Sequence, residues 1–136
     1  NFLWNQINGQ PLKLGNDEFH ATILRTPDEL QRGLSGTDNL PPDKVMLFVF
    51  PHDSFNGIWM KDMNFPIDVI WLNENKKIIH IKKNLEPCVS NCPVYYPDQN
   101  SKYVLETVAG FADKQNLKVG DTVLFNCKIY PKPNTN

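Results

Sequence analysis

The chain has 136 residues, with 14 Lys and Arg against 15 Asp and Glu, so its formal net charge is −1. This length suits one domain and allows a single core that needs neither a metal nor several disulfides. A near-neutral balance without a basic cluster argues against nucleic acid and an anionic membrane surface as partners. No apolar run approaches the ~20 residues of a spanning helix, so we expect no transmembrane segment in this chain.

The first predicted element is an N-terminal hairpin. Phe2–Ile7 and Gln10–Leu14 are separated by Asn8-Gly9, a pair that suits a tight turn because both residues accept positive φ. Pro11 has no backbone N–H, and we therefore expect the second strand of this hairpin to lie at a sheet edge.

A strand over Glu18–Leu24 is predicted next, followed by a short helix. Thr26 can be the N-cap of that helix, Pro27 its first residue, and Glu29 the partner in a capping box. Gly33 is a poor helix residue, which predicts a close backbone approach there, and Gly36 is expected to end the helix.

In the rest of the chain, short apolar runs separated by turn residues predict a series of strands. The expected strands are Val45–Phe50, Gly57–Met63, Pro66–Asn73, Lys76–Lys82, Tyr103–Val108 and Thr122–Tyr130, with a long loop over Cys88–Lys102 and a helix over Gly110–Leu117. Seven or eight strands with two short helices predict a mainly β (β-rich α+β) domain, a small barrel or sandwich. We expect one domain over 1–136: a hairpin over 1–17, a core over 18–130 and a disordered tail over 131–136.

Cys88 and Cys92 lie four residues apart between prolines. A disulfide, two free thiols or part of a metal site are the alternatives, and a metal site would need further ligands, the nearest being His80. A disulfide would favour a location outside the cytoplasm. Cys127 alternates in phase with apolar residues and is interpreted as a buried, inert thiol.

Two acidic residues occur on apolar strand faces. Asp68 shares its face with Ile70 and Leu72, and Glu106 lies between valines in the strand Tyr103–Val108. Buried carboxyl groups need cations or hydrogen bonds. The pair predicts either a catalytic pair of carboxyl groups, as in glycoside hydrolysis, or a structural salt-bridge network. The plausible cationic partners are Lys61, Arg25 and Arg32.

Trp59-Met60-Lys61-Asp62-Met63 combines an indole, two thioethers and a charge pair. This segment could form a ligand platform, which Tyr96 would extend, or it could be core residues followed by a solvated bend. His20, His52 and His80 show no metal-ligand spacing, so we expect no metal site and no cofactor.

Several blocks of the chain together resemble a known family. They are Ala21–Gly36, Met46–Pro51, Ile58–Met63 with Pro66–Asp68, Pro87-Cys88, Cys92-Pro93, Tyr96, Tyr103–Glu106, Ala109-Gly110 and Leu117–Asp121. In this order they are similar to the bacterial and archaeal domain-of-unknown-function family 192. The resemblance spans Glu18 to Tyr130. It implies a small, mainly β fold and frequent export behind a signal peptide or lipid anchor, and it implies no activity or cofactor.

The leading functional hypothesis is a non-enzymatic binding or accessory module of the cell envelope. Its ligand is unknown, a glycan or envelope component being one option, and the binding surface would comprise Trp59, Met60, Lys61, Asp68, Tyr96 and Glu106. One alternative is a glycan or cell-wall hydrolase with Asp68 and Glu106 as catalytic residues, and another is a structural component of a surface assembly. An extracytoplasmic location is expected, whether secreted, periplasmic or anchored through an N-terminal segment that this sequence lacks.

Overall fold

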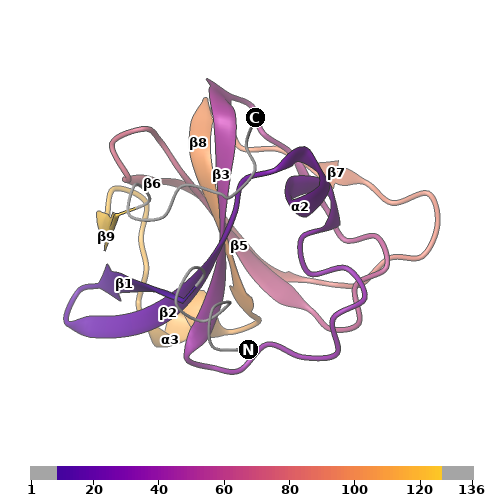
Figure 1. Ribbon diagram of the computed structural model, residues 1–136, viewed down its shortest axis with the longest axis horizontal. Helices are drawn as coiled ribbons and strands as arrows, with labels where there is room; N and C mark the ends of the chain where they lie inside the picture. Colours follow the sequence, from indigo (N-terminus) through magenta and orange to yellow (C-terminus); the bar gives the residue numbers. More distant parts are fainter. Residues whose placement is uncertain (1–8, 127–136) are drawn as a thin grey trace.

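The computed structural model describes residues 9–126, which form a curled seven-stranded sheet, a two-stranded sheet and two short helices (Figure 1). The strand order of the large sheet is β6-β5-β8-β3-β2-β1-β9, and β4 and β7 form the small sheet. The elements are β1 (Gln10–Leu14), β2 (Asp17–Leu24), α2 (Pro27–Arg32), β3 (Lys44–Ser54), β4 (Ile58–Trp59), β5 (Ile67–Leu72), β6 (Ile78–Leu85), β7 (Val94–Tyr95), β8 (Ser101–Val108), α3 (Phe111–Lys114) and β9 (Val123–Phe125). The predicted mainly β class is confirmed.

The large sheet is a half-barrel whose two edge strands meet at one end. Lys77, just before β6, pairs with Thr122, just before β9. The Val123 N–H donates to the Lys76 carbonyl (2.9 Å), and the Ile78 N–H donates to the Asp121 carbonyl (2.8 Å). These bonds bring the sheet edges together and give the sheet a concave and a convex side.

The two sides of the sheet carry separate hydrophobic clusters. The inner core draws on all seven strands and on α3, with Leu12, Leu14, Phe19, Ala21, Ile23, Val45, Leu47, Ile70, Leu72, Ile78, Tyr103, Leu105, Phe111, Val123 and Phe125. The outer core comprises Leu24, Leu34, Phe48, Ile58, Met60, Met63, Ile67, Val69, Trp71, Ile79, Leu85 and Val104. Figure 1 shows α2 and β7 on one side of the central strands and β1, β9 and α3 on the other.

Strand β5 contributes side chains to both hydrophobic clusters. All six of its residues are buried. Ile70 and Leu72 belong to the inner core, whereas Ile67, Val69 and Trp71 belong to the outer core. A strand buried on both faces has a continuous apolar sequence rather than an alternating one, and Asp68 is the single interruption.

The capping prediction for α2 is confirmed, but the end of the helix differs. The Glu29 N–H donates to Thr26 Oγ1, and a Glu29 carboxylate oxygen accepts from the Thr26 N–H. The helix ends at Gly33, three residues before the expected Gly36, because the φ of 52° and ψ of −125° at Gly33 suit glycine alone. Leu34 then turns into the outer core.

Several predicted strand boundaries were wrong. Gly57–Met63 contributes only the two residues of β4, β6 continues to Leu85, and the long loop after Cys88 contains β7. The second hairpin strand is β1, but β1 lies between β2 and β9 rather than at an edge. Pro11 fits there because β9 pairs only with Leu12–Leu14.

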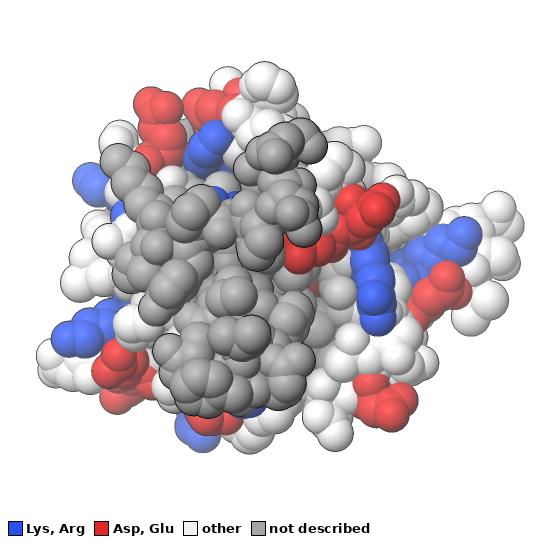
Figure 2. All heavy atoms as spheres, in the orientation of Figure 1, with Lys and Arg blue, Asp and Glu red and all other residues white. Residues whose placement is uncertain are grey.

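Other predictions fall outside residues 9–126: the first hairpin strand, the end of the last strand, Cys127 and the tail. Within that range neither helix has the length and apolar character needed to cross a membrane. Figure 2 shows acidic and basic side chains interspersed over the described part of one face, without a broad basic region.

Candidate functional site

Asp68 is fully buried on the inner side of the sheet and is held by backbone groups. Its Oδ1 accepts a hydrogen bond from the Asn84 N–H and its Oδ2 accepts one from the Ala112 N–H, both at 2.9 Å. Asn84 has a φ of 55°, and Ala112 is the second residue of α3. Asp68 thus fixes the end of β6 and the start of α3. The prediction that Lys61, Arg25 or Arg32 is its cationic partner was wrong.

Glu106 lies on the outer side of the same sheet and is 3% exposed. Among the residues that the structure describes, none forms a hydrogen bond or ion pair with its carboxyl group. Burial raises the pKa of Glu106 from 4.5 to about 8, and no charged neighbour contributes to this shift. Glu106 is therefore mainly a neutral carboxylic acid at pH 7 that can donate and accept a hydrogen bond.

The two acids do not form a carboxyl pair. In the antiparallel pairing of β5 with β8, Asp68 lies opposite Thr107 and Val69 lies opposite Glu106. Residues directly opposite each other share a face of the sheet, whereas successive residues alternate between faces. Asp68 therefore lies on the inner face and Glu106 on the outer face, which removes the geometric basis of the predicted pair of catalytic carboxyl groups.

Glu106 lines an open pocket of about 180 Å³ between the end of α2 and the β4–β7 sheet. The lining residues are Leu30, Gln31, Arg32, Gly33, Leu34, Ser35, Phe48, Gly57, Ile58, Trp59, Val94 and Glu106. Most of this lining is apolar, and Glu106 is the only acidic member that the described part of the chain contributes. A concave, mostly apolar site with one buried polar group is typical of small-ligand sites.

Two glycines of the pocket lining pack their backbone closely against neighbouring side chains. A Cβ on Gly33 would lie 2.9 Å from Phe48 Cζ and 3.8 Å from Glu106 Oε1. A Cβ on Gly57 would lie 2.5 Å from Val94 Cγ1. The close approach expected at Gly33 is confirmed, and the helix end packs directly over the ring of Phe48 beside the carboxyl group.

The structure brings together only part of the predicted binding surface. Trp59 lines the pocket and is 40% exposed, and the Lys61 ammonium lies 5.4 Å from the centre of its indole ring. Tyr96 is exposed and lies near Gly57, where an added Cβ would meet its ring at 2.7 Å. Met60 is buried in the outer core. The segment Trp59–Met63 thus contributes Trp59 to the pocket and Met60 to the outer core.

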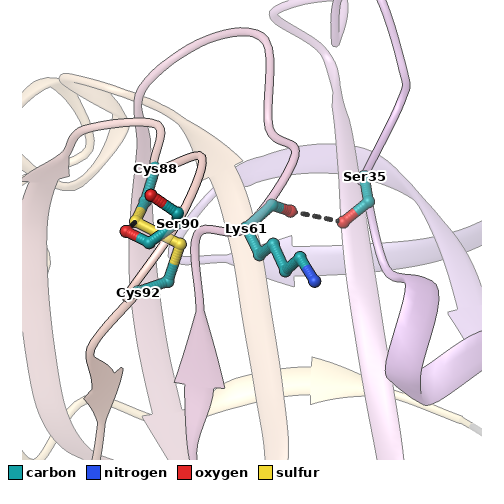
Figure 3. Close-up of a disulfide and its surroundings, with 5 residues drawn as sticks. All are labelled: Ser35, Lys61, Cys88, Ser90 and Cys92. Atoms are coloured by element: carbon teal, nitrogen blue, oxygen red, sulfur yellow. Dashed lines mark hydrogen bonds between the residues drawn. A yellow bond between two sulfur atoms is a disulfide. The ribbon is translucent and has the colours of Figure 1, made fainter.

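Cys88 and Cys92 form a disulfide that braces the pocket wall (Figure 3). The Cys88 N–H donates to the Met60 carbonyl, and the Asp62 N–H donates to the Cys88 carbonyl, both at 3.0 Å. Ser35 Oγ donates to the Lys61 carbonyl at 2.8 Å, and Figure 3 shows Ser35 on the far side of Lys61 from the disulfide. The disulfide loop, the Trp59 segment and the end of α2 are therefore linked in series.

The remaining candidates lie elsewhere. His80 Nδ1 is 3.6 Å from Asp98 Oδ1, and the His80 ring packs edge-on against Trp71. Among residues 9–126, no three His, Cys, Asp or Glu side chains gather as metal ligands would.

Sequence reasoning missed the contribution of the helix end to the site. Gln31, Arg32, Gly33 and Ser35 line the pocket although none was a predicted site residue. The glycine at position 33, within an otherwise helical pattern, was the available signal, because such a glycine indicates close backbone packing.

Comparisons with known proteins agree with this fold. Residues 11–125 match the model of the family described as "Uncharacterized ACR", domain-of-unknown-function family 192. A UPF0127 protein of Pyrococcus furiosus is 31% identical over 111 residues, which are 78% of this chain and 89% of that protein. A UPF0127 protein of Thermococcus sibiricus is 30% identical over 94 residues, 68% of this chain and 56% of that protein.

Two solved structures share the fold. A protein of Sinorhizobium meliloti, described as a candidate transcription regulator, has a TM-score of 0.77 and 23% identity, covering 85% of this chain and 90% of that one. A Novosphingobium aromaticivorans protein of unknown function has a TM-score of 0.75 and 24% identity, covering 84% of this chain and 83% of that one. Likeness at this identity concerns the fold alone. The family match over most of the chain confirms the resemblance in its sequence, and this protein belongs to domain-of-unknown-function family 192.

Proposed function

We propose that this chain is a non-enzymatic binding module whose ligand is a small molecule held in the pocket between α2, the β4–β7 sheet and Glu106. The observation that carries the proposal is Glu106 itself, a buried acid that lines an open pocket and has no partner among the described residues. Leaving a buried polar group unpaired costs about 1–3 kcal/mol, so a ligand that pairs with it regains this free energy on binding.

The rest of the pocket supports binding. Trp59 supplies a broad aromatic face at the rim, and Phe48 supplies a second ring at the base. The disulfide and its hydrogen bonds hold the Trp59 segment in place before any ligand arrives. A preorganised wall lowers the entropic cost of binding.

The same disulfide supports an extracytoplasmic location, because such bonds persist mainly in oxidising compartments. Alkylation of free thiols in intact cells, followed by mass spectrometry, tests this part. We expect Cys88 and Cys92 to be blocked from alkylation. Modification of both residues without prior reduction would contradict the proposed location.

A fragment screen by protein-observed NMR tests the binding proposal. Binding fragments should shift the Trp59 indole N–H and the backbone amides of Gly33 and Glu106. The Trp59→Ala variant should weaken their binding about tenfold or more. Phe55→Ala is the matched control, because Phe55 is an exposed aromatic residue outside the pocket lining. If no fragment shifts the pocket signals, or if both variants bind equally well, the proposal is wrong.

A further inference from the structure

We infer that the pocket selects a small organic cation, whose ammonium or guanidinium group pairs with Glu106 and whose hydrocarbon part lies against Phe48 and Trp59. This inference rests on the proposed function and adds the chemical class of the ligand.

Glu106 lacks, among the described residues, the hydrogen-bond partners that buried carboxyl groups usually have. The Glu106 residue is 3% exposed, lines the pocket and has no hydrogen-bonding or charged partner within residues 9–126. Asp68, by contrast, has both of its oxygens occupied by backbone N–H groups. The partner that a buried carboxyl group binds most strongly is a cationic N–H donor, through a charge-assisted hydrogen bond.

Two aromatic side chains, Phe48 and Trp59, line the pocket. Indole and phenyl faces attract cations through their negative π faces. Lys61 already uses the Trp59 ring in this way, with its Nζ 5.4 Å from the ring centre. Phe48 lines the pocket beside Gly33, whose backbone packs against its ring. A ligand that pairs with Glu106 therefore shares the pocket with two aromatic side chains.

The described lining of the pocket contains few charged residues. Among residues 9–126, Arg32 and Glu106 are the only charged or titratable residues that line the pocket. Met46 and Val69, the strand neighbours of Glu106 in β3 and β5, are uncharged, and Lys82 lies opposite Val69 in β6. Arg32, Lys61 and Lys82 are all exposed to solvent. Because no charged neighbour contributes to the pKa of Glu106, these cations do not neutralise it.

Binding of a cation to the protonated Glu106 should release a proton. Without ligand, Glu106 is mainly protonated at pH 7 because burial raises its pKa to about 8. When the cation arrives, the O–H bond of Glu106 breaks, the proton passes to the buffer, and an N–H···O ion pair forms with the ligand. Affinity should then rise about tenfold per pH unit between pH 5 and 7 and level off above pH 8.

Calorimetric titration with four probes of similar size tests this inference: n-butylammonium, n-butylguanidinium, the neutral n-pentanol and the anion valerate. We expect both cations to bind at least tenfold more tightly than pentanol at pH 8. Titrations at pH 7 in two buffers of different ionisation enthalpy should report the release of nearly one proton per bound cation.

Glu106→Gln, which keeps the shape of the side chain, should abolish the preference for cations and the proton release. Asp62→Asn is the matched control. It also removes one negative charge, outside the pocket lining, and Asn accepts the φ of 60° at position 62. This control variant should behave like the wild type.

The outcomes separate this inference from the proposed function. Tighter binding of valerate, or cation affinity that does not rise with pH, would overturn the cation inference. Pentanol binding at the pocket without any gain for the cations would overturn it too, while leaving the binding module in place. Failure of all four probes, together with a negative fragment screen, would overturn both.

Discussion

Asp68 and Glu106 are both buried and lie on adjacent strands of one sheet, but they differ in their hydrogen-bond partners. On the inner side, the two oxygens of Asp68 accept hydrogen bonds from the backbone of β6 and α3. On the outer side, Glu106 has no such partner among the described residues and lines a pocket. A buried acid with all its partners stabilises the fold, whereas one without partners costs stability and is available to a ligand.

The largest effect on stability is expected from replacing Asp68, the acid on the inner side of the sheet. Asp68→Ala leaves the Asn84 and Ala112 N–H groups without their acceptor, and we expect a loss of about 3–5 kcal/mol in the free energy of unfolding. Urea denaturation at pH 7 measures this loss. Asp68→Asn keeps one acceptor and should lose less. A wild-type stability for Asp68→Ala would show that these hydrogen bonds do not hold α3.

The outer acid should instead make stability depend on pH. The pKa of Glu106 is 4.5 in its ordinary state and about 8 in the fold, so the native state holds its proton more tightly than the unfolded state. Its contribution to stability is fully present below pH 4.5 and is lost as the pH rises through 8. Between these values the loss is about 1.4 kcal/mol per pH unit.

Glu106→Gln removes this dependence. The stability of the wild type relative to this variant should fall by about 3 kcal/mol between pH 5.5 and 7.5. Urea denaturation of both proteins at each pH gives the difference, in which the other titrating groups cancel. Parallel pH profiles of the two proteins would contradict the assignment of a raised pKa to Glu106.

A smaller effect is expected from removing the disulfide that braces the pocket wall on the outer side of the sheet. Replacing Cys88 and Cys92 by serine removes a short closed loop, which costs about 2 kcal/mol in the chain-entropy model. Hydrogen exchange should accelerate at the amides of Asp62 and Gly36, which belong to the braced wall. The Ala112 amide, bonded to Asp68, should be unaffected, and equal acceleration at both places would mean that the disulfide stabilises the whole fold.

The smallest effect is expected from a carboxyl group at the surface. Lys83 Nζ is 2.6 Å from Asp113 Oδ1, and both side chains are exposed. Asp113 raises the pKa of Lys83 through this hydrogen bond. Exposed ion pairs are screened by water, so Lys83→Ala should leave the urea midpoint unchanged within error. A loss as large as that of the disulfide variant would show that α3 depends on this ion pair as well as on Asp68.

Local features of the fold could be predicted from the sequence. The α2 cap depends on Thr26 and Glu29, which are three residues apart, so neighbouring residues alone determine it. The strand predicted over Pro66–Asn73 is present as β5, Ile67–Leu72. The disulfide was one of the alternatives because the spacing of Cys88 and Cys92 permits it.

The relation between the two acids could not be predicted, because it depends on the register between strands. A shift of one residue in the pairing of β5 with β8 would place Asp68 and Glu106 on the same face. The pocket was missed for a similar reason. Its lining joins the end of α2, β4 and Val94, which only the tertiary fold brings together.

The protonation of Glu106 is the central claim, and its carboxyl carbon reports on it directly. A ¹³C-detected NMR titration of the wild type, assigned by comparison with Glu106→Gln, follows this carbon from pH 3 to 10. The structure predicts a midpoint near pH 8, far above that of the exposed acids. A midpoint at 4.5 or below would show that Glu106 is charged and already has a partner, and the pocket would then lose the feature on which its proposed role depends.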